Sequence, residues 1–317
     1  MIPDVSIVIA NHNGSKYLKQ TIPHILKWHG EKEIIVADNA STDDSVQYLD
    51  SFTEIRVIKN TTISKTIGQN FAAKKSTGKY LLLLDNDIII DDENILKELV
   101  NFYESLDRPG FVGISFHNQG EEDIMYGGFF NYKWDRSRVL IHPSKIDMLH
   151  GRQIGFAFGA SLFIKRQNWE KLKGYDETYP FGAPDSDVCA RAWLFGMKNY
   201  AYTKSMGVHI GISERTQNDK YIRKYPYLIA SQQLGNILKN YSLHNAIIAL
   251  PYSLMFSILK TVKQCIERKD IRVLWAFCKG IWLFLKNLPE TLAFRSFVQK
   301  HRTEKRDAFL FIKPQHE

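Results

Sequence analysis

Cysteine is scarce in this chain and is never closely paired. Of its 317 residues only Cys189, Cys265 and Cys278 are cysteines, and none of them forms a C-x-x-C motif. Neither a disulfide framework nor a cysteine-bound metal is therefore expected, and the composition suits a reducing compartment. The residues before the first apolar run, 5–10, also lack the basic region and cleavage site of a signal peptide. We expect no secretory leader.

Long apolar runs are also missing. The longest clean run in the C-terminal part, residues 246–259, has 14 residues. As a helix it would measure about 21 Å, whereas a bilayer span needs roughly 20 residues. The next run, residues 273–288, is interrupted by Lys279 and Lys286. We therefore expect neither segment to cross a membrane.

Glycine-rich phosphate loops are absent as well. The first apolar run is followed by Asn11-His12-Asn13-Gly14, which contains a single glycine. A dinucleotide oxidoreductase would carry G-x-G-x-x-G at this point, and a sugar nucleotidyltransferase would carry its own glycine-rich loop with a nearby Arg and Lys. Both enzyme classes are disfavoured.

The positive charge of the chain is confined to its C-terminal part. The formal net charge is +8, and residues 239–317 hold 14 Lys and Arg against 6 Asp and Glu, so residues 1–238 are balanced. Hydrophobic residues make up 44% and charged residues 24%, which is typical of a folded globular protein. We predict a catalytic domain over residues 1–238 and a basic, aromatic-rich helical extension over residues 239–317.

The extension has two interpretations. Its aromatic side chains lie among Lys and Arg, as in helices that rest in the headgroup layer of an anionic membrane; they are Trp275, Phe277, Trp282 and Phe284. Alternatively, the helices pack on the catalytic domain or on a second copy of the chain, forming a homo-oligomer. No nucleic-acid-binding module surrounds the basic residues, so nucleic acid is not an expected partner.

Apolar runs and amphipathic stretches alternate over the first 115 residues. The expected strands cover residues 5–10, 33–37, 56–58, 80–84 and 111–114, and the expected helices cover residues 16–28, 45–51, 66–75 and 92–105. This alternation predicts an α/β fold in which helices flank a parallel sheet. Ligands bind such sheets at the carboxyl ends of the strands, so the residues after each strand are the candidates for a site.

Two carboxylates interrupt the most apolar of these strands. In residues 79–90, Asp85 and Asp87 are separated by one residue within an otherwise continuous apolar run. Asp is rarely buried without a partner, and carboxylates at the carboxyl end of a buried strand are suitable ligands for a divalent cation that holds a diphosphate. The alternative is a polar strand end that caps the next turn. The pair alone does not decide between them.

The order of the polar blocks along residues 4–211 resembles that of family 2 glycosyltransferases with the GT-A fold. The resemblance rests on Val5 to Gly14, Ala37 to Asp43, Asn60 with Gly68-Gln69-Asn70, Leu84 to Asp87, Gly159-Ala160-Ser161, Gly174 to Glu177, Asp185 to Arg191 and Val208-His209. It implies a mixed, Rossmann-like sheet flanked by helices, with the extension outside the shared core.

The resemblance also implies roles for these blocks. The nucleotide of the donor would be bound by Asn11, His12, Asn13, Asp38, Asn39, Asn70, Asp85 and Asn86. Asp85 and Asp87 match the D-x-D motif of the family, with Asp85 toward the ribose and Asp87 as the main metal ligand. His209 would complete the site from the far end of the domain. The expected cofactor is Mn²⁺ or Mg²⁺, which would stabilise the departing nucleoside diphosphate.

The general base implied by the resemblance is Asp185, with Asp187 as the second candidate. Relatives usually have Glu before this Asp, and here Pro184 takes its place. Proline suits the first turn of a helix but offers no carboxylate, so the change affects acceptor positioning more than the chemistry. A helix amino terminus favours the ionised form of the base but lowers its basicity.

The expected activity is an inverting, metal-assisted single displacement. The blocks and the extension are most similar to rhamnosyltransferase-related enzymes of bacterial surface polysaccharide synthesis. The resemblance implies a UDP- or dTDP-sugar donor, a glycan or polyprenyl-diphosphate-linked acceptor, and a cytoplasmic enzyme at the inner face of the membrane. The alternative is a catalytically impaired GT-A protein that serves as a membrane-associated assembly or carbohydrate-binding component.

Overall fold

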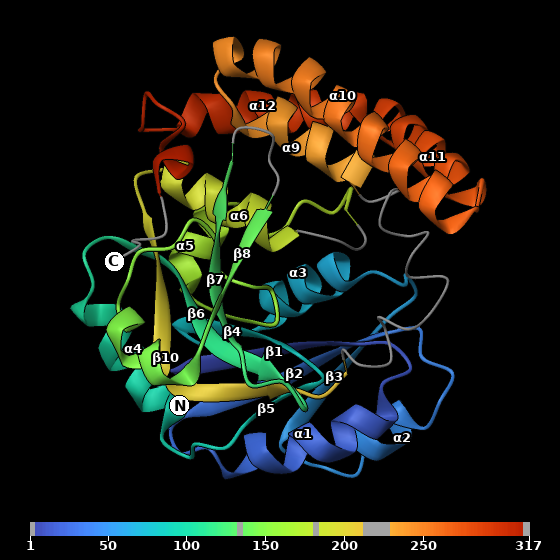
Figure 1. Ribbon diagram of the computed structural model, residues 1–317. Helices are drawn as coiled ribbons and strands as arrows, with labels where there is room; N and C mark the ends of the chain where they lie inside the picture. Colours follow the sequence, from blue (N-terminus) through green and yellow to red (C-terminus); the bar gives the residue numbers. More distant parts are fainter. Residues whose placement is uncertain (1–3, 132–135, 180–183, 212–228, 313–317) are drawn as a thin grey trace.

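A large mixed β-sheet forms the centre of the protein. The computed structural model describes residues 4–131, 136–179, 184–211 and 229–312 (Figure 1). Along the sheet the strands are ordered β3-β2-β1-β4-β9-β6-β10-β5, and β7 and β8 extend from β6. The strands are β1 (Val5–Asn11), β2 (Lys32–Asn39), β3 (Ile55–Asn60), β4 (Tyr80–Asp85), β5 (Ile88–Ile90), β6 (Pro109–Asn118), β7 (Ile124–Phe130), β8 (Arg136–Ile141), β9 (Ser161–Lys165) and β10 (Lys198–His209).

Helices cover both faces of this sheet. Those of the catalytic part are α1 (Ser15–Lys27), α2 (Ser45–Leu49), α3 (Lys65–Lys75), α4 (Ile95–Ser105), α5 (Arg166–Lys171) and α6 (Pro184–Leu194). Alternate residues of β4 point to opposite faces, as expected for a strand buried on both sides. Leu81 and Leu83 join a core with α3, α5 and α6, whereas Leu82 and Leu84 join a core with α1 and α4.

The topology brings distant residues to one edge of the sheet. Strands β1 to β4 are mutually parallel, as the alternating pattern predicts, and β9 runs antiparallel between β4 and β6. The short β5 pairs antiparallel with the end of β10, so that His209 lies opposite Ile88. Because Ile88 directly follows Asp87, this pairing places His209 beside the D-x-D segment.

Residues 116–158, whose sequence shows only weak periodicity, contain regular structure. Strands β7 and β8 pair antiparallel and are followed by a 3-10 helix, η1 (Pro143–Leu149). Residues 132–135, between the two strands, lie outside the described part of the chain. The cross-strand pairing of β7 with β6 and β8 builds an arm that the local sequence pattern did not indicate.

The C-terminal extension packs against the α6 side of the catalytic part (Figure 1). Residues 229–238, which precede the predicted extension, form η2 (Ile229–Gln233) and most of α9 (Leu234–Asn240). The extension itself continues from the end of α9 through α10 (Leu243–Arg268), α11 (Arg272–Lys286), α12 (Leu288–His301) and η3 (Ala308–Phe311). Val298 and Phe309 are fully buried in the same core cluster as α6. The domain boundary predicted after residue 238 falls within α9, so the change in charge along the sequence does not coincide with an element boundary.

Helix α10 is longer than its apolar run. The prediction that the run ending at residue 259 is too short to span is wrong for the helix, which has 26 residues. That length corresponds to about 39 Å, because charged residues such as Lys260 and Lys263 continue a helix readily. By length and composition α10 is long and apolar enough to cross a bilayer, and 28% of its most apolar window is buried in the protein.

Candidate active site

Three potential metal ligands converge at the carboxyl end of β4. One ligand atom from each of Asp85, Asp87 and His209 lies within 4.8 Å of the others. Asp87 is fully buried, and its Oδ1 is 3.1 Å from Nε2 of His209. A Cβ on Gly211 would lie 2.2 Å from Oδ2 of Asp87, so only glycine allows the backbone after β10 to pass this close. The structure thus brings together three residues that the sequence separates by 124 positions.

The donor atoms suit a divalent cation. His209 is largely buried, and neither ring nitrogen has a well-directed hydrogen bond with a described residue, although Nε2 faces Asp87. A buried imidazole without such bonds is costly unless another partner completes the site. Two carboxylates and an imidazole form a donor set that Mn²⁺ accepts, and carboxylates alone suit Mg²⁺. The residues therefore fit the predicted metal site.

Lys65 is a functional candidate that the sequence interpretation missed. Its ammonium group pairs with Oδ1 of Asp85 and donates to the carbonyl oxygen of Gly159 at 2.8 Å. Lys65 is the first residue of α3, where a positive charge opposes the helix dipole. This unfavourable position could have indicated a role for Lys65 from the sequence, because a cation in the first turn of a helix needs an anionic partner elsewhere.

The predicted nucleotide side is a hydrogen-bonded network at the ends of β1 and β2. Buried Asn11 donates to Oδ1 of Asp38 at 3.1 Å and accepts from Nδ2 of Asn86 at 2.7 Å. Asp38 in turn accepts from the backbone N–H of Ser41 at 3.0 Å. Asn39 accepts from Asn60 at 3.0 Å. The interlocking amides give this edge a fixed arrangement of donors and acceptors next to Asp85.

His12 and Asn13 are exposed at this edge. Nδ1 of His12 lies 2.8 Å from the carbonyl oxygen of Asn39, which orients the ring. Asn13 has a positive φ of 49° and accepts from the backbone N–H of Thr42 at 2.7 Å. An exposed, oriented imidazole is available to lie against a base, so the predicted role of His12 remains open to experiment.

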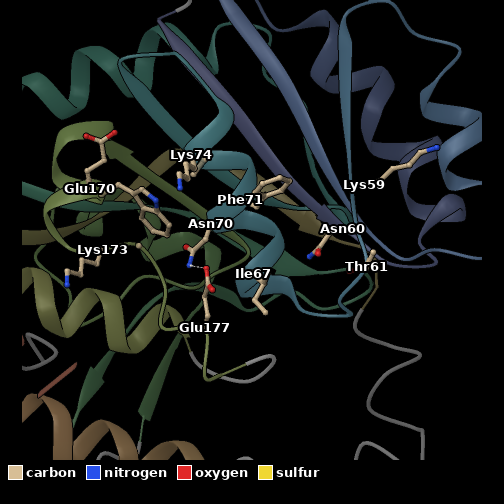
Figure 2. Close-up of a pocket in the computed structure, with 13 residues that line it drawn as sticks. Lys59, Asn60, Thr61, Ile67, Asn70, Phe71, Lys74, Glu170, Lys173 and Glu177 are labelled. Atoms are coloured by element: carbon tan, nitrogen blue, oxygen red, sulfur yellow. Dashed lines mark hydrogen bonds between the residues drawn. The ribbon is translucent and has the colours of Figure 1, made fainter. Parts of the chain in front are cut away.

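Asn70 has no hydrogen bond to Asn11, Asp38 or Asn39, although it lines the same cavity as Asn60. It donates to the carbonyl oxygen of Tyr175 and to Glu177, both at 2.9 Å, and accepts from the N–H of Tyr175 at the same distance. Figure 2 shows Asn70 and Glu177 in a cavity of about 620 Å³ between α3 and the segment after α5. The cavity is not lined by Asp85, Asp87 or Asp185. Asn70 therefore supports the segment after α5, and its contact with the nucleotide stays a prediction.

Asp185 lies in the first turn of α6. Its Oδ2 accepts from the backbone N–H of Gly159 at 2.9 Å, and its Oδ1 accepts from the N–H of Ser186 at 2.8 Å. The carbonyl of the same Gly159 accepts from Lys65. Asp185 and the Lys65–Asp85 pair thus meet at one residue, and the candidate base stands next to the candidate donor site.

Asp187, the second candidate base, is committed to a buried ion cluster. Its Oδ2 accepts from Arg191 at 2.8 Å, and its Oδ1 is 3.0 Å from the ammonium of Lys239. Burial raises the pKa of Asp187, but Arg191 and Lys239 outweigh it and hold that pKa below its usual value. The resulting stabilisation is present above the unfolded-state pKa of about 3.9 and is lost as the pH falls through the lower folded-state pKa. This geometry favours Asp185 as the base.

The sequence pattern described as "Glycosyl transferase family 2" matches residues 6–166, which is half of the chain and includes the D-x-D segment. The chain belongs to this family. Among curated relatives, the glycosyltransferase GlyG of Streptococcus pneumoniae serotype 4 is 28% identical over 167 residues, covering 50% of this chain and 54% of GlyG. The chain therefore spans about half the length of this relative.

Solved structures establish the fold of this family 2 protein. The mannosyltransferase PcManGT of Pyrobaculum calidifontis, in complex with GDP-Man and Mn²⁺, superposes with a TM-score of 0.56 at 14% identity, covering 95% of this chain and 86% of that chain. Residues 1–349 of Staphylococcus aureus TarS, in complex with UDP, superpose with a TM-score of 0.52 at 15% identity, covering 94% and 91%. The predicted GT-A fold with a helical C-terminal region is confirmed.

Proposed function

We propose that this protein is an inverting, metal-dependent glycosyltransferase that moves a sugar from a nucleoside-diphosphate sugar to a hydroxyl group. The proposal depends chiefly on the convergence of Asp85, Asp87 and His209 beside the Asn11–Asp38 network, with Asp185 joined to them through Gly159. This arrangement offers a cation site, a nucleotide site and a base at one edge of the sheet.

Each group has a distinct task in this proposal. Asp87 and His209, with Asp85, would hold Mn²⁺ or Mg²⁺, which supplies charge stabilisation for the departing nucleoside diphosphate. Asp38 would accept hydrogen bonds from the nucleoside, and Asn11 would donate hydrogen bonds to it. Asp185 would take the proton from the acceptor hydroxyl as it attacks the anomeric carbon. Attack opposite the leaving group inverts the anomeric carbon without a covalent sugar intermediate.

The comparisons support a nucleotide-sugar donor, and the finer substrate classes are part of the proposal. TarS and PcManGT were crystallised with UDP and with GDP-Man, respectively, so a nucleotide-sugar donor is supported. We propose a UDP- or dTDP-sugar as donor and a surface glycan or its polyprenyl-diphosphate-linked precursor as acceptor, with a rhamnosyltransferase-like specificity. The alternative, an impaired enzyme acting in assembly, has Pro184 in place of the expected Glu as its only support.

Donor binding should be visible as thermal stabilisation. With Mn²⁺ present, the correct sugar nucleotide at about a hundredfold excess over Kd should add about 2.7 kcal/mol of stability. This corresponds to a rise in Tm of about 4 °C for a chain of 317 residues, whose unfolding entropy is roughly 0.7 kcal/mol/K. A fluorescence-monitored screen of UDP-, dTDP- and GDP-sugars, with Mn²⁺, with Mg²⁺ and with EDTA, would identify donor and cation together. Equal stabilisation in EDTA would reject the metal-bound donor.

We also propose that the extension places the enzyme at an anionic membrane, on the cytoplasmic face. The polarity of α10 supports this, because the side chains it turns inward are small and those it turns outward are large and apolar. Its buried residues are Ala246, Ala249, Ser253, Ser257 and Thr261. Its most exposed apolar residues are Leu243, Ile247, Leu259 and Ile266, each above 60% exposed. Small residues inside and apolar residues outside are typical of helices that contact lipid.

Helix α11 continues this outer surface. Trp275 and Trp282 are 67% and 58% exposed, with Lys279 and Lys286 each 5.4 Å from a tryptophan ring. The last two turns of α10, the turn after it and α11 also carry exposed basic residues, namely Lys263, Arg268, Lys269, Arg272, Lys279 and Lys286. Tryptophan beside lysine suits the headgroup layer, and these basic residues suit anionic lipid.

Polar substitutions on this surface should weaken membrane binding without unfolding the protein. The variant with Leu259→Gln, Ile266→Gln and Trp275→Gln alters three side chains that are each more than 60% exposed. Loss of their burial in lipid should reduce vesicle binding tenfold or more, at about 1.5–3 kcal/mol per large side chain. Co-sedimentation with phosphatidylcholine–phosphatidylglycerol vesicles measures the change, and Leu140→Ser, at a position in β8 that is 55% exposed, is the control.

A surface that joins two copies of the chain would give a different result. If the face joins two copies of the chain, the triple variant should convert a dimer to a monomer in sedimentation equilibrium while vesicle binding is unchanged. If the triple variant co-sediments with vesicles as well as the wild type does, and the wild type is a monomer, this face is neither a membrane surface nor a dimer interface. Binding that weakens at high salt is expected for the exposed basic residues, because salt screens exposed charges.

A further inference from the structure

A lysine from the C-terminal extension lies inside the catalytic part of the protein. Lys239, near the end of α9, is fully buried. Its ammonium pairs with Asp176 and lies 3.0 Å from Oδ1 of Asp187. The adjacent Asn240 donates to the same Oδ1 at 2.8 Å. A buried ammonium is costly unless it is paired, so the two carboxylates specify this position for a cation.

The two carboxylates are the ends of residues 176–187, the segment that carries the candidate base and of which residues 180–183 lie outside the described part of the chain. Asp176 follows Tyr175, and its Oδ1 accepts from the N–H and hydroxyl of Thr178. Asp187 lies in the first turn of α6, two residues beyond Asp185. Lys239 therefore joins the beginning of this segment to the helix turn that carries the base.

The same segment touches the donor side of the site. The hydroxyl of Thr66 donates to the carbonyl oxygen of Tyr179 at 3.0 Å. Thr66 follows Lys65, which pairs with Asp85. The ammonium of Lys239 also lies 4.6 Å from the ring centre of Tyr179. Lys239 thus contacts the residues that link the candidate donor site to α6.

We propose that Lys239 is a positioning residue for glycosyl transfer: by holding Asp176 and Asp187 together, it fixes the first turn of α6 and thereby the carboxylate of Asp185. The inference depends on the proposed function, in which Asp185 is the base. Misplacement of a reacting group by about 1 Å can lower a rate about 100-fold, so a small shift of this turn is sufficient for a measurable effect. The extension then supplies part of the active-site framework as well as the membrane surface.

The test requires a variant that breaks the bridge without leaving an unpaired charge. Lys239→Met alone leaves the buried carboxylate of Asp176 without its cation, which is strongly destabilising. Combining it with Asp176→Asn keeps the buried cluster neutral, since Asp187 and Arg191 still compensate each other. Asn240→Ala is a milder second variant, because it removes one neutral donor to Asp187. Lys300→Met, at an exposed position near the end of α12, is the control.

Turnover per binding site separates positioning from stability. The donor is the sugar nucleotide found by the thermal-shift screen, turnover is the release of its nucleoside diphosphate (UDP for a UDP-sugar), and binding sites are counted by titrating that same nucleoside diphosphate with Mn²⁺ present. We expect kcat per site to fall about 10- to 100-fold in the double variant, and less in Asn240→Ala, with unchanged Kd for the nucleoside diphosphate. The control should match wild type.

The outcomes distinguish this inference from the function on which it depends. If Lys239 were only structural, Tm and the number of binding sites would fall together and kcat per site would stay within twofold of wild type, which overturns the positioning role. If the double variant does not fold, Lys239→Arg, which keeps the buried charge but changes the geometry of the bridge to Asp176 and Asp187, decides by the same criterion. A wild-type protein that binds but never turns over any sugar nucleotide would instead reject the proposed function, and this inference with it.

Discussion

Replacing Asp87 by alanine is expected to lower metal-dependent turnover of the sugar nucleotide by at least about 10³-fold, equivalent to about 4 kcal/mol of transition-state stabilisation. Asp87 is the fully buried carboxylate of the cluster and faces the Nε2 of His209. Without it the cation loses its central ligand, and the departing nucleoside diphosphate loses its charge compensation. Initial rates of nucleoside diphosphate release over a Mn²⁺ titration measure the effect.

Two comparisons make the Asp87 result specific. Asp87→Asn keeps the shape of the side chain and removes its charge, so it should also lose metal dependence while keeping its Tm closer to wild type. Asp91→Ala removes a carboxylate that is 85% exposed in the same segment and should retain wild-type turnover. Retention of Mn²⁺-dependent turnover by both Asp87 variants would show that the cation lies elsewhere.

Asp185→Asn is expected to abolish transfer while leaving nucleotide binding intact. The variant keeps an acceptor oxygen for the N–H of Gly159 but cannot take a proton from the hydroxyl of the acceptor. General base catalysis contributes typically 10²- to 10⁴-fold, so kcat should fall by about that factor. UDP binding by titration calorimetry and the rate of transfer, measured on the same sample, separate the two functions.

Asp187→Asn provides the matched comparison for the base. Asp187 is paired with Arg191 and Lys239 in the buried cluster, so its neutralisation leaves excess positive charge and should lower Tm markedly. Asp185→Asn leaves that cluster intact and loses one of the two backbone N–H bonds that Asp185 accepts, so it should lower Tm less. Wild-type-like transfer by the Asp185 variant would exclude this residue as the base and would leave Asp187 as the candidate.

The fold prediction was correct for the elements whose structure can be recognised from their own local sequence pattern. Apolar runs separated by amphipathic stretches indicated β1 to β4 and the helices between them, because each element can be recognised from its own periodicity. The strand β5 and the arm of β7 and β8 were not predicted, because their stability depends on pairing with β10 and β6. The length of α10 was underestimated, since a helix extends beyond its uncharged run.

The same distinction applies to the candidate site. Asp85, Asp87 and His209 could be selected from the sequence because they follow strands in the order typical of the family, and the structure brings them together. Asn70 stood in a matching block, yet its amide is used by the backbone of Tyr175. Whether a polar side chain faces a ligand or a neighbouring loop depends on packing, which a linear motif does not contain.

By itself the sequence determined which chemical groups this protein carries and in what order they follow its strands, and this was sufficient to indicate family, fold and cation site. Only the tertiary structure decided their partners. Lys65 on Asp85 and Lys239 on Asp187 join residues 20 and 52 positions apart. The outward apolar face of α10 is likewise defined by what its small residues pack against. Such pairings arise from long-range packing, so the spacing of residues along the chain cannot specify them.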